Sequence, residues 1–139
     1  MLIKEIMTRD VITIDADKSV LDACLKYKER KIGCLLVVKN KSLVGIVTER
    51  DLIERAVCER LNLEKTKISQ IMSSDIIRIS ALKKLDDAID IMKEFDIKKL
   101  PVFIDDRLVG IVTITDIYKA KPDLSQRFIK SWVSADWRD

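Results

Sequence analysis

Two copies of one short motif carry residue types that can bind a small ligand. Asp51 follows Thr48 at a distance of three residues, and Asp116 follows Thr113 at the same distance. One fixed carboxylate can accept hydrogen bonds from both hydroxyls of a ribose, as it does in dinucleotide-binding folds. A threonine at a helix start lies beside unpaired backbone amides and the positive end of the helix dipole, which favour a phosphate. The motif therefore has the chemistry to hold a sugar phosphate.

The same motif also fits a purely structural role. In a capping box, a threonine and an acidic residue three positions later satisfy each other's backbone amides, and no ligand is needed. Here, however, the motif ends the same apolar segment twice, each time after a glycine, Gly45 or Gly110, that permits close backbone approach. We interpret the pair as a ligand site in which the threonine can also cap its helix.

The motif is part of a long internal repeat. Residues 6–52 align with residues 71–117 at a constant offset of 65, and 21 of the 47 aligned pairs are identical. Self-similarity over most of a short chain indicates one structural unit used twice, with the copies packed face to face. Function is then expected between the copies.

Each copy predicts the order strand, helix, strand, strand, helix. The short β-branched runs 11–14 and 76–79 predict the first strands, and Ser19 can cap the first helix. The hairpin strands are apolar almost throughout, so helices must flank them. The first helix of each copy has apolar residues at helical spacing, namely Val20, Ala23, Cys24 and Tyr27 in one copy and Leu85, Ala88, Ile89 and Met92 in the other. The predicted hairpin strands are 35–38, 43–47, 100–104 and 108–112. The second helices begin at Thr48, with Leu52, Ile53, Ala56 and Val57 as apolar positions, and at Thr113, where the helix ends before Pro122.

Composition narrows the function classes. The 139 residues can bury a core without disulfides or a metal, and 26 basic against 23 acidic residues leave a net charge of only +3, scattered along the chain. This balance argues against nucleic acid or a membrane surface as the main partner. No apolar run is long enough to span a bilayer, and residues 1–9 lack the apolar stretch of a signal peptide, so we expect a cytoplasmic protein without a membrane partner.

The reactive side chains do not suggest an enzyme. Cys24, Cys34 and Cys58 are odd in number and widely spaced, which indicates neither a disulfide framework nor a thiolate metal site. The chain has no histidine, which excludes histidine metal ligands and every nucleophile that uses a histidine base. We therefore predict a non-catalytic protein that requires no cofactor and no metal.

The order and duplication of these segments resemble the cystathionine beta-synthase (CBS) domain family, arranged as a CBS pair. The resemblance rests on Ile6-Met7, the run 11–14, Leu100-Pro101-Val102 and the duplicated Gly-hydrophobic-Val-Thr-x-x-Asp, and it extends to about residue 121. It implies an α+β (α/β-like) fold of two tandem strand-helix-strand-strand-helix repeats, residues 1–63 and 64–121, packed with pseudo-two-fold symmetry. A tail, residues 122–139, follows and is expected to be helical.

The resemblance also implies a function. CBS pairs bind adenosine-containing ligands such as AMP, ADP, ATP or S-adenosylmethionine in clefts between the repeats, and two pairs often assemble into a flat homodimer. We therefore expect a regulatory module that senses such a ligand and signals to a partner protein.

Two clefts are implied, and each combines residues of both repeats. Apolar members would sandwich the base, although each also suits an ordinary core position. The first cleft would use Thr113, Asp116, Ile111, Met7, Ile12, Ile32 and Gly33. The second would use Thr48, Asp51, Arg50, Ile46, Met72, Ile77, Ile97, Lys98 and Pro101.

The two clefts should differ. The proline frequent in the family is present as Pro101, but the first repeat has Leu36 at the matching position. Arg50 and Lys98 would add positive charge to the cleft of Asp51, although both cations also suit a solvated surface. Our hypothesis is that this cleft binds phosphorylated ligands more tightly.

Several alternatives remain at this stage. Basic residues near one hairpin, Lys98, Lys99 and Arg107, leave a nucleic-acid-binding protein as one alternative, and a purely structural or protein-interaction module is another. An enzyme is a further class, although no pair of carboxylates lies across a recognisable cleft. The tail carries apolar residues at helical spacing that would pack on their own module or on a partner chain: Phe128, Ile129, Trp132, Val133 and Trp137.

Overall fold

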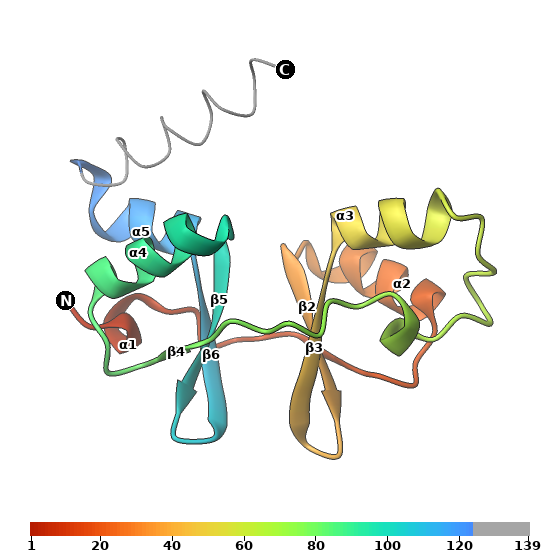
Figure 1. Cartoon of the computed structure of the whole chain (residues 1–139), viewed down its shortest axis with the longest axis horizontal. Coiled ribbons are helices and arrows are strands. Elements are labelled where there is room, and N and C mark those ends of the chain that lie inside the picture. The colour runs from red at the N-terminus through yellow and green to blue at the C-terminus, as the bar shows by residue number, and fades with distance from the viewer. Residues whose placement is uncertain (124–139) are drawn as a thin grey trace. The chain divides into compact units, whose positions relative to one another are not determined.

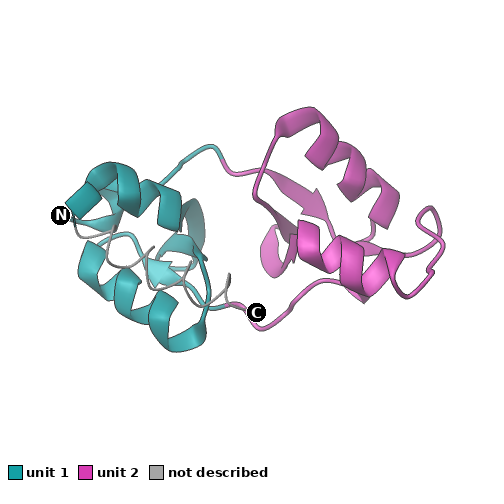
Figure 2. Cartoon of the chain, turned by 90° about the horizontal axis from the view of Figure 1, so that it is seen from above, with its two compact units in different colours: residues 1–10, 77–139 teal, residues 11–76 magenta. Residues whose placement is uncertain are grey.

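The computed structural model describes residues 1–123, and the chain divides into two compact units (Figures 1 and 2). Unit 2 is the continuous segment 11–76, whereas unit 1 combines residues 1–10 with the chain from residue 77 onward. Each unit therefore contains the hairpin of one repeat and the segment that precedes the first strand of the other. Most of the tail predicted to be helical, residues 122–139, lies outside the described residues.

Unit 2 contains a three-stranded sheet of order β1-β2-β3. Strand β1 pairs parallel with β2, and β2 forms an antiparallel hairpin with β3. The parallel pair requires the crossover helix that the sequence predicted between them. The elements are β1 (Thr13–Asp15), α2 (Val20–Arg30), β2 (Cys34–Lys39), β3 (Ser42–Thr48), α3 (Glu49–Asp51), the π-helical η1 (Leu52–Val57) and the 3₁₀ turn η2 (Ile68–Gln70).

Unit 1 repeats this topology with the sheet order β4-β5-β6. Its first pair is again parallel and its second pair antiparallel. The mixed α+β architecture of two matching units confirms the predicted fold class. The elements are α1 (Ile3–Ile6), β4 (Ile79–Ser80), α4 (Leu85–Phe95), β5 (Lys99–Ile104), β6 (Arg107–Thr113) and α5 (Ile114–Ala120).

Local sequence signals explain where the elements of unit 2 begin and end. The Ser19 hydroxyl accepts a hydrogen bond from the Asp22 amide at 3.0 Å, and the Asp22 carboxylate accepts one from the Ser19 amide at 3.2 Å. This capping box starts α2 as predicted. The β2–β3 turn places Asn40 and Lys41 at φ values of 50° and 66°, the left-handed pair typical of a two-residue hairpin turn.

Each unit buries its own apolar core. In unit 2, Val20 and Ala23 of α2 are buried against Leu35 and Val47 of the hairpin. The corresponding positions of unit 1 form a second cluster.

In the part of the chain that the structure describes, no helix has both the length and the apolar character needed to cross a bilayer.

Two details differ from the prediction. The first strands begin later than expected, at Thr13 and Ile79, a few residues after the boundaries between the units, which follow Asp10 and Ile76. The side chains of Ile53 and Val57 are 57% and 56% exposed. They belong to η1, where the Cys58 amide donates to the Ile53 carbonyl at 2.8 Å, five residues back, so the buried face is not that of a regular α-helix.

Candidate functional site

In unit 1 the motif forms the corner where β6 passes into α5. The Thr113 hydroxyl accepts a hydrogen bond from the Asp116 amide at 3.2 Å, and the Asp116 carboxylate accepts from the Thr113 amide at 2.9 Å. The Thr113 hydroxyl also lies 3.1 Å from the same carboxylate oxygen, Oδ2. The capping box considered from the sequence is therefore present.

A second hydroxyl reaches this carboxylate from the N-terminal segment. Thr8 Oγ1 donates to Asp116 Oδ1 at 3.2 Å, although the two residues are 108 positions apart. The Thr8 amide also donates to the Ile111 carbonyl at 2.8 Å, and the Ile111 amide donates back at 2.9 Å. The segment that carries Met7 is thereby fixed along β6, beside the predicted ligand residue Asp116.

Gly110 explains how this segment approaches the strand. A Cβ atom at this position would lie 2.8 Å from the Thr8 carbonyl oxygen and 2.9 Å from Met7 Sδ. Both distances are too short for real atoms, so only glycine leaves room for the segment. The structure thus brings together four residues predicted for the first cleft, namely Met7, Ile111, Thr113 and Asp116.

In unit 2 the equivalent corner joins β3 to α3. The Asp51 carboxylate accepts a hydrogen bond from the Thr48 amide at 2.9 Å, and the Thr48 hydroxyl accepts from the Asp51 amide at 3.2 Å. The other carboxylate oxygen, Oδ1, lies 3.7 Å from Arg55 Nε. Arg55 also donates to the carbonyls of Ile71 and Met72, at 3.2 and 3.3 Å. The guanidinium therefore links the motif to the segment that carries Met72.

The segment that carries Met72 approaches β3 in the same way as the segment that carries Met7 approaches β6. The amides and carbonyls of Ile46 and Ser73 bond each other, both at 2.9 Å. A Cβ at Gly45 would lie 2.8 Å from Met72 Cγ and 3.1 Å from the Ser73 carbonyl oxygen. Four residues predicted for the second cleft, Ile46, Thr48, Asp51 and Met72, are therefore neighbours within unit 2.

Tyr27 supports the corner in unit 2 from α2. Its hydroxyl donates to the Val47 carbonyl at 2.7 Å, one residue before Thr48. Burial, followed by electrostatic interactions with Cys34, Glu49 and Asp51, raises the pKa of the Tyr27 phenol above its ordinary value. The phenol thus stays protonated and remains a donor to the strand end.

The other predicted site residues lie near the corners or in the cores. Ile12 and Ile32 pack on the core of unit 2, and Ile77 and Ile97 pack on that of unit 1, each partly buried. Gly33 precedes β2, directly before Cys34. That the two groups of residues meet in shared clefts concerns the placement of one unit against the other, and it stays a prediction.

The three remaining residues have identifiable neighbours. The Arg50 guanidinium lies 2.7 Å from the Glu54 carboxylate on the surface of the α3–η1 helix. The Lys98 carbonyl accepts from the Ile114 amide at 3.0 Å, so its backbone lies at the start of α5. Pro101 is paired with Ile111 across the β5–β6 hairpin.

Capping leaves both carboxylates with capacity for a ligand. A carboxylate offers about four lone-pair sites, and at both Asp116 and Asp51 the motif's amide occupies a site on one oxygen, Oδ2. Oδ1 of Asp116 accepts only from Thr8 among residues 1–123. The Asp51 side chain is 15% exposed, so solvent reaches it. Each corner can therefore cap its helix and accept hydrogen bonds from a diol.

Sequence reasoning did not identify Thr8, Arg55 or Tyr27. The repeat offered one signal, because the offset of 65 aligns Thr8 with Ser73 and places a hydroxyl residue after each methionine. Arg55 and Tyr27 align with Ala120 and Met92, so the repeat contains no matching polar residue for them.

Within residues 1–123, no group of three or more cysteine or acidic residues is arranged to hold a metal.

Comparison with known proteins decides the family. The family model "CBS domain" matches the chain twice, over residues 3–57 and 68–123. The chain belongs to the CBS domain family. Among curated relatives of this CBS protein is an uncharacterized protein of Methanopyrus kandleri, 33% identical over 122 residues, an alignment that covers 86% of this chain and 62% of the relative. The chain thus spans less than two thirds of that relative.

Solved structures of CBS proteins are similar over the same region. A putative signal-transduction protein with CBS domains from Burkholderia ambifaria is 28% identical, with a TM-score of 0.81 and coverage of 86% of this chain and 93% of the other. The CBS domain pair of protein MJ0100, solved in complex with 5′-methylthioadenosine and S-adenosyl-L-methionine, is 30% identical. Its TM-score is 0.77, and the match covers 86% of this chain and 94% of the other.

Proposed function

We propose that this CBS pair is a non-catalytic regulatory module that binds an adenosine-containing ligand between its repeats. AMP, ADP, ATP and S-adenosylmethionine are the candidates. The observation that carries the proposal is the duplicated corner, in which Thr48 with Asp51 and Thr113 with Asp116 adopt the same geometry beside a methionine segment. The complex of a similar CBS pair with two adenosine compounds supports the ligand class.

The chemistry of the corner suits such a ligand. Oδ1 of each aspartate would accept the ribose hydroxyls, and the helix start would face a phosphate or another negatively charged group. Met7 and Met72 would contact the base, since a thioether packs well against an aromatic ring. Few polar side chains are needed for the base itself, because backbone groups can read its edge.

Regulation requires that the ligand bind two arrangements of the repeats unequally. We propose that ligand binding shifts this equilibrium in a homodimer of CBS pairs in the cytoplasm, and that a partner protein reads the change. The exposed side chains of Ile53 and Val57 on η1 offer an apolar face for the dimer contact.

Titration calorimetry against AMP, ADP, ATP, S-adenosylmethionine and GTP tests the ligand. Asp116→Ala and Asp51→Ala remove one carboxylate each, and a lost charged hydrogen bond of about 1.5 to 3 kcal/mol corresponds to roughly ten-fold to more than a hundred-fold in affinity. The controls are Asp87→Ala and Asp22→Ala, because these carboxylates accept the N-cap amides of α4 and α2 in the same way, at 3.1 and 3.2 Å.

Micromolar binding of an adenosine ligand, weakened by a motif variant and unchanged by its control, would establish the proposal and identify the cleft in use. If motif and control variants lose stability equally and affinity not at all, the motif is a helix cap. No binding across the panel would favour the interaction-module or nucleic-acid alternatives. A steep fall of RNA or DNA affinity with salt would then distinguish the latter.

A further inference from the structure

One guanidinium in unit 2 contacts both the candidate ligand site and the segment that leads out of the unit. Arg55 Nε lies 3.7 Å from Asp51 Oδ1, the oxygen proposed to accept the ribose. Arg55 Nη1 donates to the carbonyls of both Ile71 and Met72, at 3.2 and 3.3 Å. The Arg55 side chain is 51% exposed, so a ligand at this corner can reach the guanidinium.

The segment held by this guanidinium is the last part of unit 2 before the chain passes, after Ile76, into unit 1. The amides of residues 71–73 donate to the carbonyls of Ile68 and Ile46 at 2.9 to 3.0 Å. Within the described part of the chain, residues 74–78 make no backbone hydrogen bond. The guanidinium therefore acts on the last residues of unit 2 that hydrogen bonds hold in place.

Unit 1 holds its matching segment without a cation. Arg55 aligns with Ala120 in the second repeat. There the contact between the segment and the motif carboxylate is the bond from the Thr8 hydroxyl to Asp116. This tie is a neutral hydroxyl on the segment itself, whereas the tie in unit 2 is a positively charged side chain on a neighbouring helix. An anion can attract the second tie but not the first.

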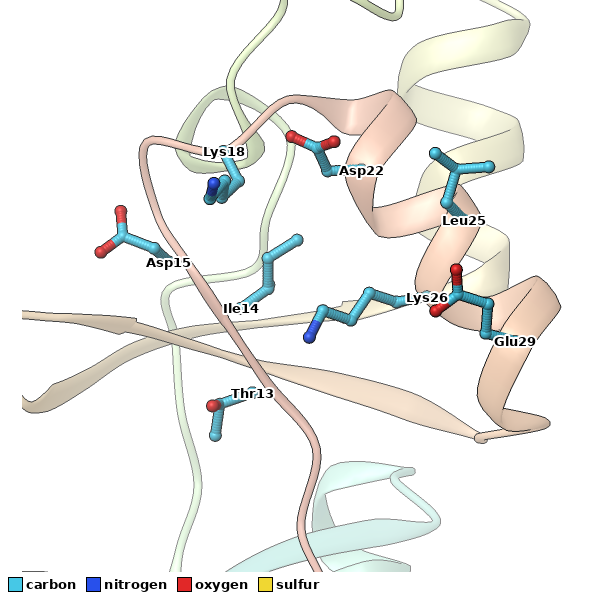
Figure 3. A pocket seen from close by; sticks show the side chains of 8 residues that line it. All are labelled: Thr13, Ile14, Asp15, Lys18, Asp22, Leu25, Lys26 and Glu29. Carbon is cyan, nitrogen blue, oxygen red and sulfur yellow. The ribbon is translucent and has the colours of Figure 1, made fainter.

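The lysines of the hollow in unit 2 are placed differently. The hollow has a volume of about 420 Å³ and lies between β1 and α2 (Figure 3). Charged residues of both signs line it, namely Lys18, Lys26, Asp15, Asp22 and Glu29. This mixture favours neither an anion nor a cation. Lys26 thus provides a matched cation of the same unit that lies away from the Asp51 corner.

We propose that Arg55 is a latch, which an anionic group of the bound ligand opens. The latch rests on the proposed nucleotide site, because the phosphate of a nucleotide would be this group. A phosphate can accept two parallel charge-assisted hydrogen bonds from a guanidinium, in place of one N–H group shared between two neutral carbonyls. When Arg55 turns to the phosphate, Asp51 Oδ1 becomes available to the ribose and the hold on residues 71–73 weakens. Ligand binding then changes the chain that leads into unit 1, which supplies one of the two arrangements that regulation requires.

Hydrogen exchange of the full chain tests the latch, with inorganic pyrophosphate as the probe and with ionic strength held constant by sodium chloride. Pyrophosphate should accelerate exchange at the amides of residues 71–73 by roughly ten-fold, which corresponds to the loss of one hydrogen bond to a charged group. Simple binding without a latch would slow exchange or leave it unchanged. The Thr8 amide, which bonds to Ile111 in unit 1, is the internal control and should exchange at the same rate throughout.

Three variants identify the group that responds. Arg55→Ala should show the accelerated exchange without pyrophosphate and should no longer respond to it. If this variant fails to fold, Arg55→Lys replaces it, because lysine keeps the charge but lacks the planar fork and should also exchange faster than the unsubstituted protein. Lys26→Ala is the matched control, since it removes a cation that lines the hollow. It should keep both the slow exchange and the response to pyrophosphate.

The outcomes separate the latch from the proposed function. Unchanged exchange with pyrophosphate, or a response that Arg55→Ala retains or Lys26→Ala abolishes, would overturn the latch. If AMP binds in calorimetry but pyrophosphate leaves exchange at residues 71–73 unchanged, the nucleotide site stands and the latch is wrong. If pyrophosphate accelerates this exchange but no adenosine compound binds, the latch stands and the proposed ligand class is wrong.

Discussion

The approach of the N-terminal segment to β6 yields a quantitative prediction. In Gly110→Ala the new Cβ would lie 2.8 Å from the Thr8 carbonyl oxygen, a backbone atom that cannot move without its segment. Overpacking costs about 1 to 3 kcal/mol. Losing the two bonds between Thr8 and Ile111 would add about 0.5 to 1.5 kcal/mol each. We expect the free energy of unfolding to fall by about 2 to 6 kcal/mol.

Gly45→Ala is the matched substitution in the other unit, and it should cost less. There the closest atom is Met72 Sδ, the flexible end of a side chain, and the nearest backbone atom is the Ser73 oxygen at 3.1 Å. Because alanine has less conformational entropy than glycine in the unfolded chain, the substitution also gains about 0.4 to 1 kcal/mol, which offsets part of this cost. A net loss of about 0 to 2 kcal/mol is therefore expected.

Double-mutant cycles in urea distinguish the two cases. Met72→Ala removes the atoms that oppose a Cβ at position 45, so its coupling with Gly45→Ala should be favourable by about 1 kcal/mol or more. Met7→Ala leaves the Thr8 carbonyl in place and should rescue Gly110→Ala only in part. Hydrogen exchange at Thr8 should accelerate in Gly110→Ala. If Gly110→Ala has the same free energy of unfolding as the unsubstituted protein, or if Met7→Ala restores its stability completely, the reasoning is refuted.

Two further predictions concern unit 2. Tyr27→Phe removes the hydrogen bond from the phenol to the Val47 carbonyl and should lower the free energy of unfolding by about 0.5 to 1.5 kcal/mol, whereas the exposed Tyr118→Phe should change it little; equal effects in urea melts would contradict this. Burial raises the pKa of the Cys24 thiol, so at pH 8 a smaller thiolate fraction than usual should make it react with iodoacetamide more slowly than the exposed Cys58. Mass spectrometry of alkylated peptides checks the order, and faster modification of Cys24 would disprove it.

The sequence predicted the local elements well because their signals are local. The hairpins, the Ser19 cap and the helices that begin at Thr48 and Thr113 depend on short-range periodicity and capping, and the structure confirms them. The family prediction is confirmed as well. These features required no knowledge of which repeat contacts which segment.

The missed features depend on distant or asymmetric contacts. An offset alignment treats the copies as equal, so only the family resemblance placed Met7 with Asp116, and the bond from Thr8 to Asp116 was not predicted. The π-helical geometry of η1 is likewise invisible in an apolar pattern that suits an α-helix. Arg55 was missed because its position in the second repeat is an alanine.

The two motif carboxylates are held by different chemistry, and this difference bears on ligand choice. Asp116 has neutral donors, the Thr113 amide and the Thr8 hydroxyl, whereas Asp51 has the Arg55 guanidinium 3.7 Å away. A ribose at Asp116 would compete with one hydroxyl. A ribose at Asp51 would compete with the Arg55 guanidinium, which is half exposed and whose charge Asp51 screens only weakly. That same cation would attract a phosphate, so Arg55, more than Arg50, is the residue we expect to make the Asp51 corner prefer phosphorylated ligands.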